Sequence, residues 1–281
     1  MSKTLIGSAL AAALAIGGAW HLLGNKPVIK AAEAATEKPV AAVPTRTLRV
    51  ALEGKYPPFE FINAQKQLVG FNIDVANALC AEIKARCEFK RYGWDELIPA
   101  LQKGEADAII ASMSITPERQ QKVLFTYIYT RVPGAYIAPK TERIIWPVIT
   151  AERIRDKTIG VPSDTTFDDY VKHELEPAGV KVKRYPSAED VFAALKLGEV
   201  QLVFGDSAVL TDFIRVPGNA EQFEVVGNKV QGSEWLGQGE AIAIAQNQPA
   251  LRDELNGALQ KLITSTTYDE LQNRYFLFRV L

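Results

Sequence analysis

The sequence predicts an α/β protein of two similar lobes that hold a ligand between them. The main observation is an internal repeat: residues 95–114 and 189–208 align without a gap at a constant offset of 94 residues. Each copy describes an amphipathic helix, a glycine stop and a short apolar strand that ends in small polar residues, which indicates one lobe per copy. Because ligands of open α/β sheets bind beyond the carboxyl ends of strands, two such ends predict a site between two lobes.

The predicted elements of the first lobe begin with a strand at 48–52. A helix follows Gly70, because apolar residues recur there at helical spacing. The helix of the first repeat has Asp95 as its N-cap and ends at Gly104, and a strand at 106–111 comes next.

The second lobe is predicted to begin after the turn at 132–134. Its elements are a strand at 135–138, a strand at 157–161, a helix at 167–175, a helix opened by Ser187 and a strand at 201–204. A strand at 241–245 returns to the first lobe, and helices from Pro249 and over 268–276 complete it. We therefore assign residues 47–132 plus 238–281 to lobe 1 and residues 133–237 to lobe 2.

Composition indicates a globular protein and excludes several classes of site. The 281 residues are 47% hydrophobic and 23% charged, which suits one large or two medium domains. A net charge of −1 without a basic tract gives no indication of nucleic-acid binding. Two His and two Cys without zinc spacing argue against a metal site. No catalytic serine motif, paired His or phosphate loop is present, so neither an enzyme nor a cofactor is expected.

Residues 1–24 are predicted to be a signal peptide or an N-terminal anchor. Lys3 precedes an apolar run at 5–23 with small residues at 17–19, a pattern typical of export. The run is also long enough for an uncleaved span, so retention at the inner membrane stays open beside cleavage. Residues 25–46 are predicted to form a disordered tether. The chain is therefore expected in the periplasm.

Cys80 and Cys87 are expected to form a disulfide. On one helix their Cα atoms would be roughly 10 Å apart, whereas a disulfide needs less than about 7 Å. The helix must then end near residues 85–86, with Cys87 opening the next strand. In an exported protein a bridge is favoured over two buried thiols.

Two helix starts could hold an anion. Thr116 is predicted to be the N-cap of a helix with Pro117 as its first residue, which places Arg119 in the first turn. Arg119 is either a solvated charge or shares a carboxylate with the helix N-terminus. Residues 163–166 open a second such helix, where Asp164 or Thr165 could instead serve only as a cap.

Asp206 could hold a cation. The repeat aligns it with Ser112, at the exit of an apolar strand. It either caps the helix that follows or faces a cationic ligand group. Together with Ser114 and Arg119 in the other lobe, it would form a clamp for a zwitterion across a cleft.

These segments also carry a family resemblance. The runs LVGFNIDVANALC and LIPALQKGEADAIIASMSITPERQQKVLFT closely resemble the periplasmic polar and basic amino-acid-binding proteins of ABC importers, solute-binding protein family 3. The chain looks most like the lysine/arginine/ornithine, histidine and arginine binders of that family, over about 47–276. The resemblance implies a two-lobed periplasmic-binding-protein (venus flytrap) fold of type II, with the ligand in the cleft between lobes that close by hinge motion.

The resemblance also implies roles for single residues. Arg119 would grip the α-carboxylate of an amino acid with help from Ser114 and Thr166, while Ser112 and Asp206 would take its α-ammonium.

Three further residues would select the ligand's side chain. Tyr56 and Trp94 would sandwich it, because aromatic faces suit an aliphatic stem or a guanidinium. Glu53 would face its cationic end.

The chain departs from the family pattern at three places. Ala111 stands where some relatives have Ser, Asp164 replaces a usual Gly, and Phe167 replaces a polar residue. An extra carboxylate at Asp164 would weaken carboxylate binding unless it points away or meets a cation.

The resulting expectation is a solute-binding protein, a monomer, that captures an L-amino acid such as arginine, lysine or ornithine for an inner-membrane ABC permease. A neutral polar ligand such as glutamine stays open. Two alternatives are a tethered sensory ligand-binding domain and an enzyme of the cyclohexadienyl or arogenate dehydratase type, with Glu53 or Asp164 as its acid.

Overall fold

The computed structural model describes residues 46–281 of the chain. The predictions for the signal or anchor segment and for nearly all of the tether lie outside these residues. Within 46–281, none of the helices is both long enough and apolar enough to cross a membrane. The described residues form two five-stranded sheets and one small three-stranded sheet.

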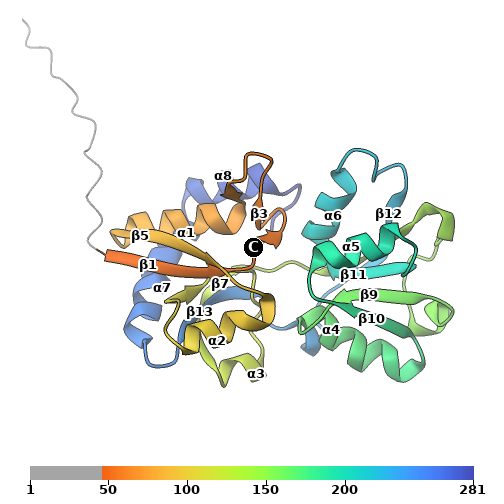
Figure 1. Cartoon of the computed structure of the whole chain (residues 1–281), viewed down its shortest axis with the longest axis horizontal. Helices are drawn as coiled ribbons and strands as arrows, with labels where there is room; N and C mark the ends of the chain where they lie inside the picture. Colours follow the sequence, from red (N-terminus) through yellow and green to blue (C-terminus); the bar gives the residue numbers. More distant parts are fainter. Residues whose placement is uncertain (1–45) are drawn as a thin grey trace, which may run out of the picture. The chain divides into compact units, whose positions relative to one another are not determined.

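The two large sheets share one topology (Figure 1). The first has the order β5-β1-β6-β13-β7, with β1 at Arg46–Leu52, β5 at Ala85–Arg91, β6 at Ala108–Ile109, β7 at Val123–Thr130 and β13 at Glu240–Ala245. The second has the order β10-β9-β11-β8-β12, with β8 at Gly134–Pro139, β9 at Thr158–Pro162, β10 at Lys181–Tyr185, β11 at Leu202–Asp206 and β12 at Phe223–Val230. In each sheet three parallel strands lie beside an antiparallel fourth.

Helices cover both faces of each sheet, as the alternating side chains of the strands require. On the first sheet, α1 (Phe71–Glu82), α7 (Pro249–Ile263) and α8 (Thr266–Tyr275) pack on Val50 and Ile242, while α2 (Leu97–Gln102) packs on Ala51 and Ala243 (Figure 1). The second sheet carries α4 (Thr166–Tyr170), α5 (Ala188–Lys196) and α6 (Ser207–Arg215), and α3 (Pro117–Gln120) precedes β7. The predicted α/β fold of two lobes is confirmed.

The internal repeat occupies equivalent places in the two lobes. The first copy contains α2 and β6, and β6 is the central strand of its sheet and runs parallel to β1. The second contains nearly all of α5 and all of β11, and β11 is the central strand of its sheet and runs parallel to β9. The aligned residues Ser112 and Asp206 therefore lie at the same point of their lobes, just beyond or at the end of the third strand.

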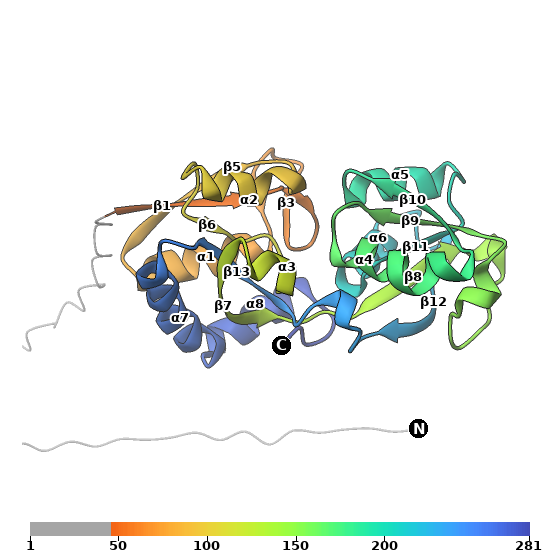
Figure 2. The same ribbon diagram turned by 90° about the horizontal axis from the view of Figure 1, so that it is seen from below.

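The chain passes between the two sheets twice, and Figure 2 shows these runs next to each other. The first run joins β7 to β8 and the second joins β12 to β13. The runs are bonded together, since Arg131 Nε donates to the carbonyl of Gln238 at 3.1 Å and the isolated bridge between Ser114 and Glu240 lies beside them. We propose that the lobe boundaries lie in these two runs.

Gly70 fixes the entry into α1. Its φ is +131°, and a Cβ there would lie 2.3 Å from the carbonyl oxygen of Phe59. Only glycine tolerates that backbone and that approach. The tight entry holds the small sheet of β2 (Lys55–Tyr56), β3 (Glu60–Ile62) and β4 (Leu68–Val69) against the first lobe.

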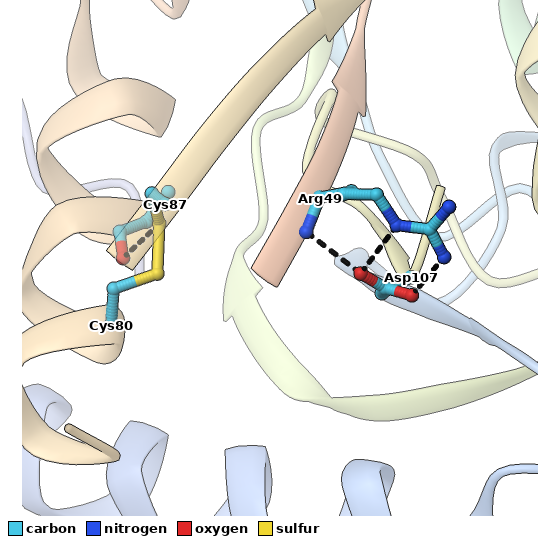
Figure 3. The surroundings of a disulfide bond; sticks show 5 residues. Arg49, Cys80, Cys87 and Asp107 are labelled. Atoms are coloured by element: carbon cyan, nitrogen blue, oxygen red, sulfur yellow. Dashed lines mark hydrogen bonds and ion pairs between the residues drawn. A yellow bond between two sulfur atoms is a disulfide. The ribbon is translucent and has the colours of Figure 1, made fainter. Parts of the chain in front are cut away.

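Cys80 and Cys87 form the predicted disulfide, with Cα atoms 5.8 Å apart (Figure 3). The predicted helix end was three residues too late, because α1 ends at Glu82 and Lys84 turns the chain at φ +54°. Cys87 is therefore the third residue of β5 rather than its first. The bridge ties the end of α1 to an edge strand of the sheet.

Replacing both cysteines with serine is expected to lower the free energy of unfolding by about 2–3 kcal/mol, since the bridge closes a short loop in the unfolded chain. Urea unfolding of the double variant, compared with the oxidised wild type, measures this difference. Equal unfolding midpoints for the two proteins would contradict it.

Other boundaries also differ from the predictions. Asp95 is not an N-cap, because residues 94–96 form a 3-10 turn in which Gly93 N–H donates to Glu96 Oε2 at 2.9 Å. The strand predicted at 106–111 has regular pairing only at Ala108–Ile109. The helix predicted at 167–175 begins at Thr166 as α4 and continues as a π-helical turn over Val171–Leu175.

Candidate functional site

One cavity gathers all eight residues that the sequence singled out for ligand binding. It has an empty volume of about 560 Å³ and is lined by both lobes. Its predicted lining residues are Glu53, Tyr56, Trp94, Ser112, Ser114, Arg119, Thr166 and Asp206.

The parallel strands explain why these residues meet. Glu53 follows β1, Trp94 follows β5, Ser112 follows β6, Thr166 follows β9 and Asp206 ends β11. Each lies at the carboxyl end of a parallel strand, where open α/β sheets hold their ligands. The topology therefore brings together residues that are far apart in the sequence.

Arg119 is held in place by its own lobe and reaches the other one. Thr116 Oγ1 caps α3 by accepting from Arg119 N–H at 3.2 Å, as predicted. The guanidinium donates to the carbonyl of Ser114 at 3.0 Å and lies 5.3 Å above the ring of Trp94. Burial lowers the pKa of Arg119, but a guanidinium stays charged at neutral pH.

Asp164 joins the lobes through its backbone. Its carbonyl accepts from Trp94 Nε1 at 2.9 Å and from the Arg119 guanidinium at 3.2 Å. Its φ of +59° lies in the left-handed region that favours glycine, which gives a physical reason for a glycine at this position. Asp164 is exposed and lines outer grooves rather than the cavity, so its carboxylate is not among the groups that would meet a bound anion there.

Thr166 and Phe167 are the next two lining residues that the second lobe contributes. Thr165 is the cap of α4, since its Oγ1 accepts from Asp168 N–H at 3.3 Å. Thr166, the first residue of α4, is buried and lines the cavity. Phe167 also lines it, with its ring packed edge-on against Phe204.

Asp206 caps a helix, as one of the two sequence interpretations predicted, and it also lines the cavity. Its Oδ1 accepts from Ala208 N–H at 2.7 Å and from Val209 N–H at 3.2 Å, at the start of α6. Among the described residues, Oδ2 has no hydrogen-bond partner. Burial raises the pKa of Asp206 to about 7, which shows how costly the charge is without a counter-ion.

Glu53 and Tyr56 lie at the end of the cavity nearest the small sheet. Tyr56 stacks on Phe59, with ring centroids 5.7 Å apart, which leaves its other face available. Glu53 is half-buried, and its carboxylate has no hydrogen-bond partner within residues 46–281. Burial raises the pKa of Glu53 to about 7, so a cation beside it would be favourable.

Sequence reasoning missed two further carboxyl groups in the cavity lining, Glu60 and Glu240. Glu60 is 1% exposed and accepts a hydrogen bond from the Asn72 amide. Glu240 is 7% exposed, and burial raises its pKa to about 8. Glu240 could have been noticed in the sequence, because it is a charged residue at the start of the apolar run at 240–245. Glu60 lies between two phenylalanines, and no sequence pattern there indicates a binding residue.

The family model "Bacterial extracellular solute-binding proteins, family 3" matches residues 48–278 of the chain. The chain belongs to this family. It shares the family's type II fold of two lobes, as the resemblance in the sequence implied. The match covers nearly all of the residues that the structure describes.

Relatives of this family-3 protein are named as binding proteins. It is 34% identical over 237 residues to the putative ABC transporter arginine-binding protein 2 of Escherichia coli (strain K12), covering 84% of this chain and 93% of that one. A solved periplasmic binding protein of Salmonella typhimurium, described as having high arginine specificity, superposes with a TM-score of 0.74 at 30% identity, covering 82% and 99% of the two chains.

One similar structure links the fold to an enzyme. The ancestral amino-acid-binding protein AncCDT-1, described as a precursor of cyclohexadienyl dehydratase, superposes with a TM-score of 0.71 at 28% identity, covering 82% and 95% of the two chains. Family membership therefore establishes the fold and the class of solute-binding proteins, and the cavity must indicate the ligand.

Proposed function

We propose that this family-3 protein is an exported binding protein that captures a cationic L-amino acid, such as arginine, lysine or ornithine, in the cavity between its lobes. The observation that carries the proposal is the charge of the cavity lining. Four carboxyl groups and a single guanidinium are among the described lining residues, and the buried Oε2 of one of these carboxyl groups, Glu240, has no hydrogen-bond partner there. A ligand with one carboxylate and two cationic groups complements this arrangement.

Each end of such a ligand has a counterpart. Arg119, with Ser114 and Thr166, is placed to bind the α-carboxylate, and a planar guanidinium suits a carboxylate bidentately. Asp206 and Ser112 are placed to bind the α-ammonium, because the free Oδ2 of Asp206 can accept from it.

Three other lining residues suit a cationic side chain. Tyr56 and Trp94 offer aromatic faces for its stem, and Glu53 supplies a carboxylate for its charged head. The Arg119–Trp94 contact already shows that this ring accepts a guanidinium over its face.

The proposed setting follows from the class of protein. A binder of this kind acts as a monomer in the periplasm and hands its ligand to an inner-membrane ABC permease. Similarity to arginine-binding relatives of ABC transporters supports this setting. The dehydratase alternative is less well supported, because Asp164 lies outside the cavity and Glu53 is then the single candidate acid of the two considered.

Calorimetric titration of the purified protein with arginine, lysine, histidine and glutamine tests the proposal. We expect arginine or lysine to bind with a Kd of about 1 μM or tighter, and glutamine to bind more weakly. Prephenate turnover is the control reaction for the enzyme alternative. If none of the four amino acids binds, the proposed function is refuted.

A further inference from the structure

Glu240 lies where the two runs between the lobes meet. It opens β13, and its Cα partner is Thr130, the last residue of β7. An isolated bridge also pairs it with Ser114. Its side chain lines the same cavity as Ser112 and Ser114.

The carboxyl group of Glu240 is incompletely bonded. Its buried Oε2 and the neighbouring Thr130 hydroxyl make no hydrogen bond of good geometry among the described residues. Thr130 and the Val132 backbone still lower the pKa of Glu240, but less than burial raises it. A buried acceptor without a partner costs free energy that a ligand can recover. Asp206 also lines this cavity, and its charge raises the pKa of Glu240.

The other charges of the site can be assigned without Glu240. In the proposed function Arg119 takes the carboxylate, Asp206 the ammonium and Glu53 the side-chain cation. Glu60 has the Asn72 amide as its partner. Glu240 is left over, beside Asp206. Two buried carboxyl groups whose charges repel each other are not both ionised in the absence of a cation, so the pair retains a proton.

We propose that Glu240 is a second acidic contact for the ligand's α-ammonium, next to Asp206, and that the two carboxyl groups exchange one shared proton for that ammonium. The inference rests on the proposed function. No bond of the ligand changes: the ammonium keeps its own protons, donates to both carboxylates, and the displaced proton passes to solvent. An ammonium has three N–H donors, so two carboxylates and Ser112 can satisfy it.

The other titratable groups facing this pair do not supply the proton. Tyr56, Tyr129 and Tyr268 surround it from β2, β7 and α8, and burial raises the pKa of each further from neutrality. Lys229 on β12 acts on Asp206 and favours its charged form. The raised pKa values of Asp206 and Glu240, about 7 and about 8, place the exchange near neutral pH.

Calorimetry of arginine binding at pH 7, in two buffers that differ in ionisation enthalpy, counts the protons released. We expect net release by the wild type, less release by E240Q, and arginine binding about tenfold to a hundredfold weaker in E240Q. E234Q is the matched control, because Glu234 is exposed on the same run and outside the cavity; it should behave as wild type.

A second ligand, 5-guanidinopentanoic acid, is arginine without its α-amine. The wild type should release fewer protons with this ligand than with arginine, since only protons from Glu53 can then be released. E240Q should bind this ligand as tightly as the wild type does. The inference would be overturned if the wild type released equal numbers of protons with both ligands. It would also be overturned if E240Q lost the same amount of affinity for both ligands. The wild-type comparison holds even if E240Q fails to fold. Wild-type protein that binds no amino acid would instead refute the proposed function, and the inference with it.

Discussion

Replacing Arg119 with lysine is expected to weaken arginine binding by about a hundredfold, and replacing it with alanine by more. Lysine keeps the positive charge but loses the planar fork that can hold a carboxylate with two parallel hydrogen bonds. It also loses the contacts that now position the guanidinium, namely the bond to Ser114 and the stacking on Trp94. Calorimetric titration with arginine measures the change.

The matched control is R155K, because Arg155 is exposed and does not line the cavity. Its arginine affinity should equal that of the wild type. Thermal unfolding of the ligand-free R119K variant should stay within a few degrees of the wild type, since the lost hydrogen bonds are partly solvated. Arginine binding by R119K at wild-type strength would show that the carboxylate binds elsewhere.

Asp206→Asn is expected to weaken arginine binding by about a hundredfold while preserving the fold. The variant separates the two roles of Asp206. Asparagine is as good an N-cap as aspartate, so α6 should still begin at Ser207. The amide has no charge to pair with an ammonium, and it cannot release a proton.

The same substitution should also make the free energy of unfolding of the ligand-free protein less dependent on pH. Burial raises the pKa of Asp206 to about 7, above that of an aspartate in an unfolded chain. The folded state therefore binds more protons than the unfolded state between about pH 4 and 7, and its stability falls as the pH rises through that window. We expect D206N to unfold at a higher temperature than the wild type at pH 8 and at a similar temperature at pH 4.

Asp212→Asn is the control for D206N, because Asp212 lies on the same helix and outside the cavity. It should leave arginine affinity unchanged. If D206N binds arginine as tightly as D212N does, Asp206 is a helix cap and no part of the ammonium site.

The fold and the placement of the site were largely predictable from the sequence. The internal repeat predicted both the fold and the place of the site, since it indicated one helix and one strand per lobe and aligned Ser112 with Asp206. Local chemistry predicted Thr116 as a cap and the Cys80–Cys87 bridge, and both are confirmed. These features depend on residues close in sequence or on an offset that the sequence displays directly.

What could not be predicted depends on contacts across the fold. Glu240 enters the cavity because β13 pairs with the distant strand β7, and no local pattern contains that pairing. Asp164 was a concern because its backbone conformation was unknown, and its carboxylate proves to lie outside the cavity. Asp95 was predicted to be a cap, but the Glu96 carboxylate, which accepts from Gly93 N–H, has that role instead.

The central claim is that the cavity selects an amino acid by the positive charge of its side chain. Titrating the protein with arginine and with citrulline tests it most directly, because the two have nearly the same shape and differ in a charged guanidinium against a neutral urea. We expect citrulline to bind at least about tenfold more weakly than arginine, and E53Q to narrow that difference. Equal affinities for the two ligands in the wild type would contradict the claim.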